Sequence, residues 1–207
     1  MSNQVIVLQD GYSRWHTKPY SMLANGTSTL IRLNNGQNII VDTLGPWDRD
    51  RLLKLLQDNR MTTSDVSMVI GTHLHTDHIG NLNLFPQAAQ IVGDQRSSGD
   101  YFEFDIFRGQ RSLQLTENVD LISTPGHMHN DVSVICRNVE RFGTVAIVGD
   151  LFESSADLQN EQLWIDAGSM DPPIQRNNRD YILSIADYIV PGHGGMFKVQ
   201  DFLQKNR

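Results

Sequence analysis

The stretch GTHLHTDHIG (71–80) constrains the fold most, because it places His73, His75, Asp77 and His78 within six positions. Four side chains that bind protons or metal ions repel one another when several are charged together. A fold that brings them close therefore needs a compensating charge. Histidine and carboxylate are ligands that zinc and other transition metals accept. The apolar run just before the stretch predicts a buried strand that ends where these side chains begin.

Three more ligand-type residues, each preceded by a glycine, follow apolar runs further along the chain: His127, Asp150 and His193. Four strands would thus deliver such side chains just beyond their carboxyl ends, where ligands collect in sheets with βα connections. Five histidines and two aspartates exceed what one tetrahedral zinc ion needs, and they suit two ions. The sequence therefore predicts a site for two divalent metal ions. Zinc is the first expectation, and the same ligands also suit iron or manganese.

The rest of the chain alternates apolar, β-branched runs with helical periodicity, which predicts an α/β fold in one domain over residues 1–207. Strands are expected at 4–9, 27–33, 38–43, 65–72, 119–127, 131–137, 144–150 and 188–193. Helices are expected over 48–59 (with Asp48 as a cap), near 157–167 and over 172–187. Residues 93–109 show no clear period and are expected to form a long loop.

Composition limits the classes of function. With 39% hydrophobic and 20% charged residues, the chain is typical of a soluble globular protein. A net charge of −7 argues against a broad nucleic-acid-binding surface, although a small basic patch or a metal pair would attract phosphate locally. One cysteine, Cys136, excludes an internal disulfide and favours a reducing compartment. We see no signal peptide or membrane-spanning stretch, so we expect a cytoplasmic protein that is not secreted, with nuclear entry left open.

The ordered blocks THLHTDH, TPGH, VGD and VPGHG resemble the metallo-β-lactamase superfamily, whose fold is a four-layer αβ/βα sandwich. The pattern extends over residues 42–193, which is most of the chain. A His-x-His pair alone would be a weak signal, whereas the complete set in order is specific. Within the superfamily, the blocks most resemble an animal member that is described as a histone pre-mRNA endonuclease.

The resemblance implies a role for each matching residue. The first metal ion is expected to be held by His73, His75 and His127, and the second by Asp77, His78 and His193. Asp150 matches the carboxylate that bridges the two ions. Asp77 and Asp150 are the candidate catalytic residues. Asp42 matches an acidic residue that orients a ligand through a hydrogen bond.

Two bridged ions lower the pKa of a shared water from about 15.7 to near neutrality, and the resulting metal-bound hydroxide attacks a carbonyl carbon or phosphorus. The resemblance implies that this hydrolase is an endoribonuclease that cleaves RNA phosphodiester bonds. A glyoxalase II type of enzyme acting on a small thioester or ester is the enzymatic alternative. A metal-binding scaffold without turnover is the alternative from another class. The complete second ligand set argues against a single-iron dioxygenase.

Substrate contacts are less constrained. Arg96, Arg108 and Arg111 flank an aromatic stretch and could place guanidinium groups beside stacked bases, with solubility as the competing explanation. His129 is either a proton donor at the site or a surface or supporting histidine. The aromatic residues of the stretch could pack a core or line the interface of a homodimer.

Overall fold

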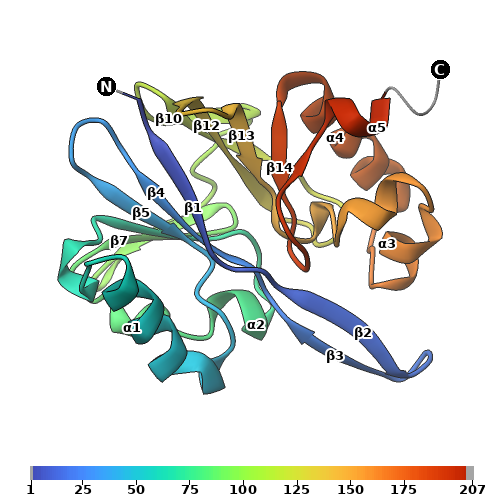
Figure 1. Cartoon of the computed structure of the whole chain (residues 1–207), viewed down its shortest axis with the longest axis horizontal. Helices are drawn as coiled ribbons and strands as arrows, with labels where there is room; N and C mark the ends of the chain where they lie inside the picture. The colour runs from blue at the N-terminus through green and yellow to red at the C-terminus, as the bar shows by residue number, and fades with distance from the viewer. Residues whose placement is uncertain (1, 204–207) are drawn as a thin grey trace.

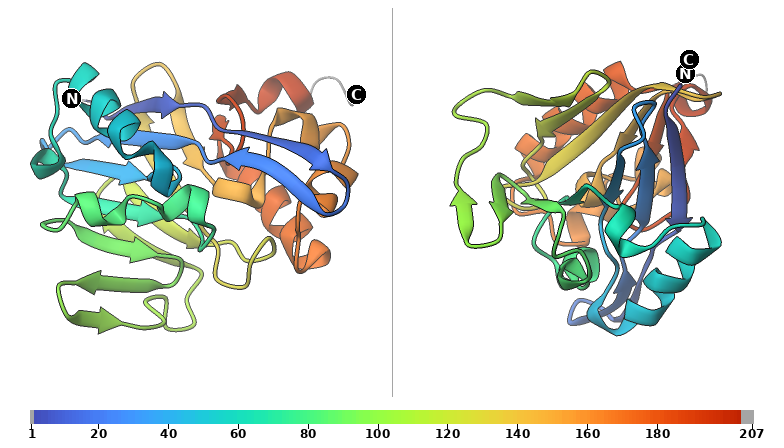
Figure 2. Two further views of the ribbon diagram at one scale, coloured as in Figure 1. Left: turned by 90° about the horizontal axis from the view of Figure 1, so that it is seen from below. Right: turned by 90° about the vertical axis from the view of Figure 1, so that its left-hand side faces the viewer.

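The computed structural model describes residues 2–203, in which two β-sheets pack face to face with helices on their outer faces (Figures 1 and 2). The 7-stranded sheet has the order β1 (Gln4–Gln9), β4 (Ser28–Arg32), β5 (Asn38–Val41), β6 (Met68–Gly71), β7 (Ala89–Val92), β8 (Gln95–Ser98) and β9 (Tyr101–Glu103). The 6-stranded sheet has the order β10 (Ser112–Thr116), β11 (Val119–Ser123), β12 (Val132–Val139), β13 (Gly143–Ile147), β14 (Tyr188–Val190) and β15 (Phe197–Lys198). The predicted four-layer αβ/βα sandwich is confirmed.

The helices lie outside the two sheets or beside the sheet edge. They are α1 (Arg49–Asp58), α2 (Thr76–Ile79), α3 (Gln162–Asp166), α4 (Pro172–Ile185) and α5 (Gln200–Leu203). Short 3₁₀ turns are η1 (Pro46–Asp48), η2 (Thr63–Asp65), η3 (Leu82–Leu84), η4 (Gly149–Leu151) and η5 (Ser155–Leu158). Over residues 2–203, no helix has the length and apolar character needed to cross a membrane.

Successive apolar side chains along the strands point to opposite faces, which explains why both faces of each sheet are covered. In β5, Ile39 and Val41 pack between the two sheets, whereas Ile40 packs under α1 with Leu52 and Leu56. Strand β12 repeats the pattern: its even-numbered apolar residues face the other sheet, and its odd-numbered Ile135 faces the α4 side. Successive side chains of a strand point to opposite faces, so a continuous apolar run requires a partner on each side.

Two local predictions are wrong. Residues 93–109 are not a structureless loop, because they contain strands β8 and β9, which extend the first sheet through pairing with β7. These strands are short and largely polar, so their pairing depends on a neighbour that sequence periodicity does not reveal. Asp48 occupies the position before α1 but makes no capping hydrogen bond, and its carboxylate instead accepts from Asn25 Nδ2 at 2.8 Å.

The hairpin of β2 (Tyr12–Thr17) and β3 (Ser21–Asn25) was not anticipated from the sequence. It forms its own two-stranded sheet and extends away from the sandwich beside α3 (Figure 1). Lys18 near its tip pairs with Asp166 of α3. The hairpin therefore borders the region where the strands of both sheets end.

Strand directions bring the ligand-bearing strand ends to a single edge. In the second sheet, β11 and β13 both run antiparallel to β12, and β14 runs parallel to β13. In the first sheet, β5, β6 and β7 run parallel to one another. The carboxyl ends of β6, β11, β13 and β14 can therefore meet between the sheets.

Candidate metal centre

All seven predicted ligand residues gather at this edge. His73 and His75 follow β6, Asp77 and His78 lie on α2, His127 follows β11, Asp150 lies on η4 after β13, and His193 follows β14. Their ligand atoms form two groups in which all atoms lie within 4.8 Å of one another. One group is His73, His75, His127 and Asp150, and the other is Asp77, His78 and His193. The structure thus brings together the residues that the sequence predicted, in the predicted division.

Asp150 lies between the two groups. Its Oδ2 atom is 3.4 Å from Nε2 of His73, 3.4 Å from Nε2 of His127 and 3.3 Å from Nε2 of His193. Its other oxygen, Oδ1, is 3.2 Å from Nε2 of His78. Because one carboxylate faces imidazoles of both groups, it occupies the place that a bridging ligand requires.

Asp42 fixes the protonation of one imidazole. Its Oδ1 atom accepts from the Thr72 backbone N–H at 2.7 Å, and Oδ2 accepts from the Thr72 hydroxyl at 2.9 Å. Oδ2 also lies 2.7 Å from Nδ1 of His78. Since a carboxylate only accepts, Nδ1 carries a proton, and in the neutral ring the lone pair of Nε2 points into the centre. Asp42 therefore lies where the resemblance placed it.

His193 is oriented in the same way by a backbone group. Its Nδ1 atom lies 3.0 Å from the carbonyl oxygen of Asn25, at the end of β3. A carbonyl also only accepts, so Nε2 of His193 faces Asp77 and Asp150 without a proton when the ring is neutral. The β2–β3 hairpin thus contributes a backbone contact that no sequence motif predicts.

Burial and neighbouring charges shift the pKa values of the clustered groups in different directions. Burial lowers the pKa of His73, and burial lowers that of His127 to about 3. Burial has the same tendency at His78 and His193, but neighbouring carboxylates together outweigh it. Asp150 and Asp42 raise the pKa of His78 well above its ordinary value, and Asp150 and Glu153 raise that of His193 to about 9. Burial would raise the pKa of Asp150, and the neighbouring imidazoles instead hold it well below its usual range.

Buried polar atoms without a hydrogen-bond partner indicate whether these residues fit a pair of metal ions. Buried atoms without a hydrogen-bond partner among the described residues include Asp77 Oδ2, His78 Nε2, His127 Nδ1 and Asp150 Oδ1. The 3.2 Å approach of His78 Nε2 to Asp150 lacks the geometry of a hydrogen bond. A buried polar atom without a partner costs about 1–3 kcal/mol. His127 faces the cluster through Nε2 and not through Nδ1, so the atoms that call for a missing partner in the centre are those of Asp77, His78 and Asp150. Lone-pair donors of mixed imidazole and carboxylate type fit divalent cations.

Glu153 is a further acidic residue that the sequence analysis missed. It is buried, its Oε2 atom lies 3.9 Å from Nε2 of His193, and it accepts from the Ser13 hydroxyl at 3.2 Å. With Asp150 and His193 it forms a third group whose ligand atoms lie within 4.8 Å. Burial and the Asp150 carboxylate raise its pKa well above the ordinary value. Its position three residues after Asp150 was the available signal, but that spacing alone did not separate it from a surface acid.

None of the four candidate substrate contacts belongs to the groups of ligand atoms. Arg96 and Arg108 both pair with Glu103, at 3.7 and 2.8 Å. The guanidinium of Arg111 lies 3.7 Å from the ring centroid of Tyr181 on α4, and it donates to Asn178. His129 is exposed, two residues beyond His127. Each arginine thus has a partner within the protein, and a substrate role for these four residues stays a prediction.

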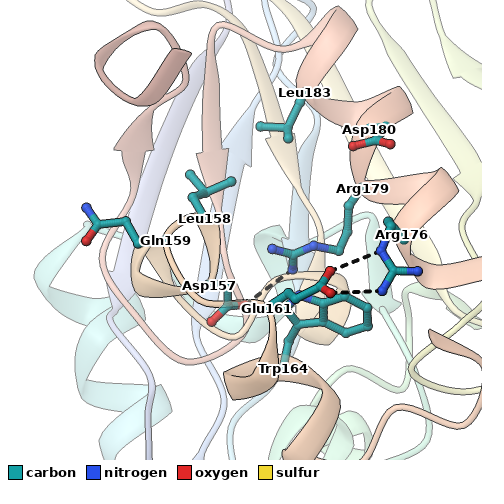
Figure 3. A pocket seen from close by; sticks show the side chains of 9 residues that line it. All are labelled: Asp157, Leu158, Gln159, Glu161, Trp164, Arg176, Arg179, Asp180 and Leu183. Atoms are coloured by element: carbon teal, nitrogen blue, oxygen red, sulfur yellow. Dashed lines mark hydrogen bonds and ion pairs between the residues drawn. The ribbon is translucent and has the colours of Figure 1, made fainter. Parts of the chain in front are cut away.

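Two pockets lie near α3. One of about 170 Å³ is bordered by Ser13, Trp15 and Met22 of the hairpin, by Glu153, and by Leu163 of α3, so it adjoins the candidate centre through Glu153. The other, of about 380 Å³, lies between η5, α3 and α4 (Figure 3). Its arginines are already paired, Arg176 with Glu161 and Arg179 with Asp157.

Comparisons with known proteins agree with this geometry. The family model described as metallo-beta-lactamase superfamily matches residues 23–193. Metallo-beta-lactamase domain-containing protein 1 of Xenopus laevis is 39% identical over 199 residues, covering 95% of this chain and 82% of the relative. The human protein of that name is 43% identical over 164 residues, covering 78% of this chain and 59% of the relative.

Solved structures share the fold at low sequence identity. B. thuringiensis AiiA with N-decanoyl-L-homoserine bound at its active site has a TM-score of 0.66 and 17% identity, over 93% of this chain and 92% of that one. AidC, a dizinc quorum-quenching lactonase, has a TM-score of 0.64 and 17% identity, over 86% and 76% of the two chains. At such identity the likeness shows the sandwich and no more.

Proposed function

Because the chain belongs to the metallo-beta-lactamase superfamily, we propose that its clustered histidines and aspartates hold two divalent metal ions and hydrolyse phosphodiester bonds in single-stranded RNA. Membership of the superfamily and the clustered ligand-type side chains indicate a metal-dependent hydrolase. One observation carries the proposal of a metal pair: seven ligand-type side chains converge from four strand ends, and buried atoms of Asp77, His78 and Asp150 that face the centre lack partners among the described residues. Zinc is the proposed metal.

Each group of side chains would hold one ion, with Asp150 between them. When bound, two such ions supply a water of lowered pKa and positive charge for the oxygen that becomes negative during hydrolysis. Asp42 and the Asn25 carbonyl accept from Nδ1 of His78 and His193, so that in the neutral rings the lone pair lies on the metal-facing Nε2. The protein therefore contributes a preorganised set of lone pairs, and no serine or cysteine nucleophile is required.

The RNA substrate is supported by the sequence resemblance and by the rim of the centre. His75 has a side chain that is 48% exposed, so the centre is reachable from solvent. Trp47 is 89% exposed. A Cβ atom added to Gly45 would lie 3.8 Å from the Trp47 ring and 3.9 Å from the Cα of Asp77, so the exposed ring lies near one residue of the centre. Exposed aromatic rings bind single-stranded nucleic acid by stacking on bases. A cytoplasmic or nuclear location belongs to the same proposal.

The test compares substrates with zinc-loaded protein. End-labelled single-stranded RNA, DNA of the same sequence, duplex RNA and a small thioester are incubated under identical conditions. We expect cleavage of single-stranded RNA that leaves a 5′-phosphate on the downstream product. His75→Ala should abolish the reaction, which excludes a contaminating nuclease. Thioester turnover that His75→Ala abolishes, without RNA cleavage, would overturn the RNA substrate and leave the metal hydrolase intact.

A further inference from the structure

Helix α4 buries a face that is mostly polar. Its buried residues are Gln175, Asn178, Arg179 and Ile182, and Gln175 has no exposed surface. The other long helix, α1, buries two leucines instead. Buried amides and guanidiniums occur where they make specific hydrogen bonds, since an unsatisfied polar group is costly. The three polar residues are spaced three and four positions apart and so share one side of the helix.

The hydrogen bonds from this side go to the two loops that carry His127 and Asp150. Nε2 of Gln175 donates to the carbonyl oxygens of Asp150 and Leu151, at 3.0 and 3.3 Å. Nδ2 of Asn178 donates to the carbonyl oxygen of Pro125 at 2.7 Å. One helix thus holds the backbone of η4 after β13 and the backbone of the β11–β12 loop at the same time.

Arg179 also binds the backbone of η4. Its guanidinium donates to the carbonyl of Leu151 at 2.7 Å and to Asp157 at 3.3 Å. The same group lies 3.9 Å from the ring centroid of Phe152 and 4.9 Å from that of Trp164. Figure 3 shows it over Trp164, with the interaction to Asp157 dashed. A buried cation that is stacked and paired in this way has little freedom to move.

The loop that carries His127 lies directly against the helix. A Cβ added to Gly126 would lie 2.4 Å from the Cα of Gln175, so the backbone approaches as closely as glycine permits. The backbone N–H of Asp171, which caps α4, donates to the Gly126 carbonyl at 2.9 Å. Met170 donates to the His127 carbonyl at 3.2 Å.

We infer that Gln175, Asn178 and Arg179 are positioning residues that set the separation of His127 from Asp150, and through it the metal affinity of the centre. The two side chains approach to 3.4 Å, and they come from loops separated by strand β12. Support around metal ligands commonly changes affinity by 10–100-fold when it is removed. The inference rests on the proposed metal centre.

Arg111 extends this set of contacts. Its guanidinium donates to Oδ1 of Asn178 at 2.8 Å and stacks over Tyr181. Because a guanidinium only donates, it orients the amide so that Nδ2 faces the Pro125 carbonyl. The structure thus gives Arg111 a role within the protein that does not require RNA.

The experiment measures metal binding separately from turnover. Gln175→Met keeps the shape of the side chain and removes its donor, and Asn178→Leu does the same at the second loop. Asn177→Leu is the matched control, since Asn177 is the exposed neighbour on the same helix. Zinc affinity is measured by competition with a chromophoric chelator, and coordination is followed by the visible spectrum of cobalt-loaded protein. We expect affinities about 10–100-fold weaker and an altered cobalt spectrum for the two buried changes, and neither effect for Asn177→Leu.

The second readout is independent of metal. In the metal-free protein, the imidazole NMR signals of His127 should shift in Gln175→Met and stay in place in Asn177→Leu. If Asn178→Leu does not fold, Arg111→Leu replaces it, because Arg111 is exposed and orients the same amide; a loss of a few fold in zinc affinity is then expected. Wild-type affinity, cobalt spectrum and His127 signals in folded variants would overturn the inference. Failure of the wild-type protein to bind zinc would overturn the proposed function, while the His127 signals would still decide the role of α4.

Discussion

Oδ2 of Asp42 lies 2.7 Å from Nδ1 of His78, although the two residues are 36 positions apart in the chain. Asp42 has a positive φ of 59°, a conformation that asparagine tolerates better than most residues. The Asp42→Asn substitution therefore changes the hydrogen-bonding groups and leaves the backbone conformation accessible.

In Asp42→Asn, the Thr72 backbone N–H still needs an acceptor, so the new amide keeps its oxygen there and presents its NH2 group to His78. Nδ1 of His78 must then accept, which moves its proton to Nε2 and removes the lone pair that faces the centre. We expect one metal ion to bind about 10–100-fold more weakly. Elemental analysis after dialysis against limiting zinc measures this. Asp50→Asn, a change at an exposed acid, is the control, and full occupancy of both sites in Asp42→Asn would contradict the assignment.

Gly192 approaches Asp150 more closely than any side chain would allow. A Cβ added there would lie 1.9 Å from Oδ1 of Asp150 and 2.9 Å from the backbone carbon of Gly149. Gly192→Ala must displace the Asp150 carboxylate, the proposed bridging ligand, or the chain that carries it. We expect loss of metal binding and a free energy of unfolding lower by about 1–3 kcal/mol.

Chemical denaturation and a zinc-binding assay check the Gly192→Ala prediction. Gly195→Ala serves as a matched control in the same segment, because its added Cβ would meet its nearest atom at 3.5 Å, an ordinary contact. Equal metal binding by the two alanine variants would show that Asp150 is not held where the structure places it.

The candidate ligand set could be predicted because each member comes soon after a recognisable apolar strand, and His127, Asp150 and His193 each directly follow a glycine. The residues that support the set were harder to predict. Asn25 contributes only a backbone carbonyl, and any residue type has one. Gln175 and Glu153 acquire their roles through packing of segments that are distant in the sequence, and a buried glutamine on an amphipathic helix resembles a surface residue until its neighbours are known.

The strands also differ in how well the sequence predicts them. Buried strands with two covered faces, such as β5 and β12, have strong apolar runs and were located to within a few residues. The hairpin strands β2, β3, β8 and β9 contain no buried residue, so they carry almost no hydrophobic period. Their structure depends on backbone pairing with neighbours, which a single sequence does not report.

Cys136 should be chemically inert in the native protein. It lies on β12 without exposed surface, and burial raises the pKa of its thiol to about 12. At pH 8 about one molecule in ten thousand would then carry the thiolate, which is the reactive form. We expect no reaction with a disulfide reagent at pH 8 until the protein is unfolded in guanidinium chloride, when one equivalent reacts. Reactivity should rise only as the pH approaches 12, and rapid labelling of the folded protein at pH 8 would contradict this assignment.

The Trp47→Ala substitution tests whether single-stranded nucleic acid binds over the centre. The Trp47 ring is 89% exposed and is therefore available to stack on a base. Stacking of one base on an aromatic ring contributes about 1–3 kcal/mol, so Trp47→Ala should raise the KM for RNA by roughly 5–150-fold with little change in kcat. Phe102→Ala on β9 is the matched control, because Phe102 is also exposed, at 57%, but belongs to the far hairpin of the first sheet. If Phe102→Ala raises KM and Trp47→Ala does not, RNA binds over the arginine-flanked aromatic stretch instead; if neither changes KM, base stacking makes no contribution at either place.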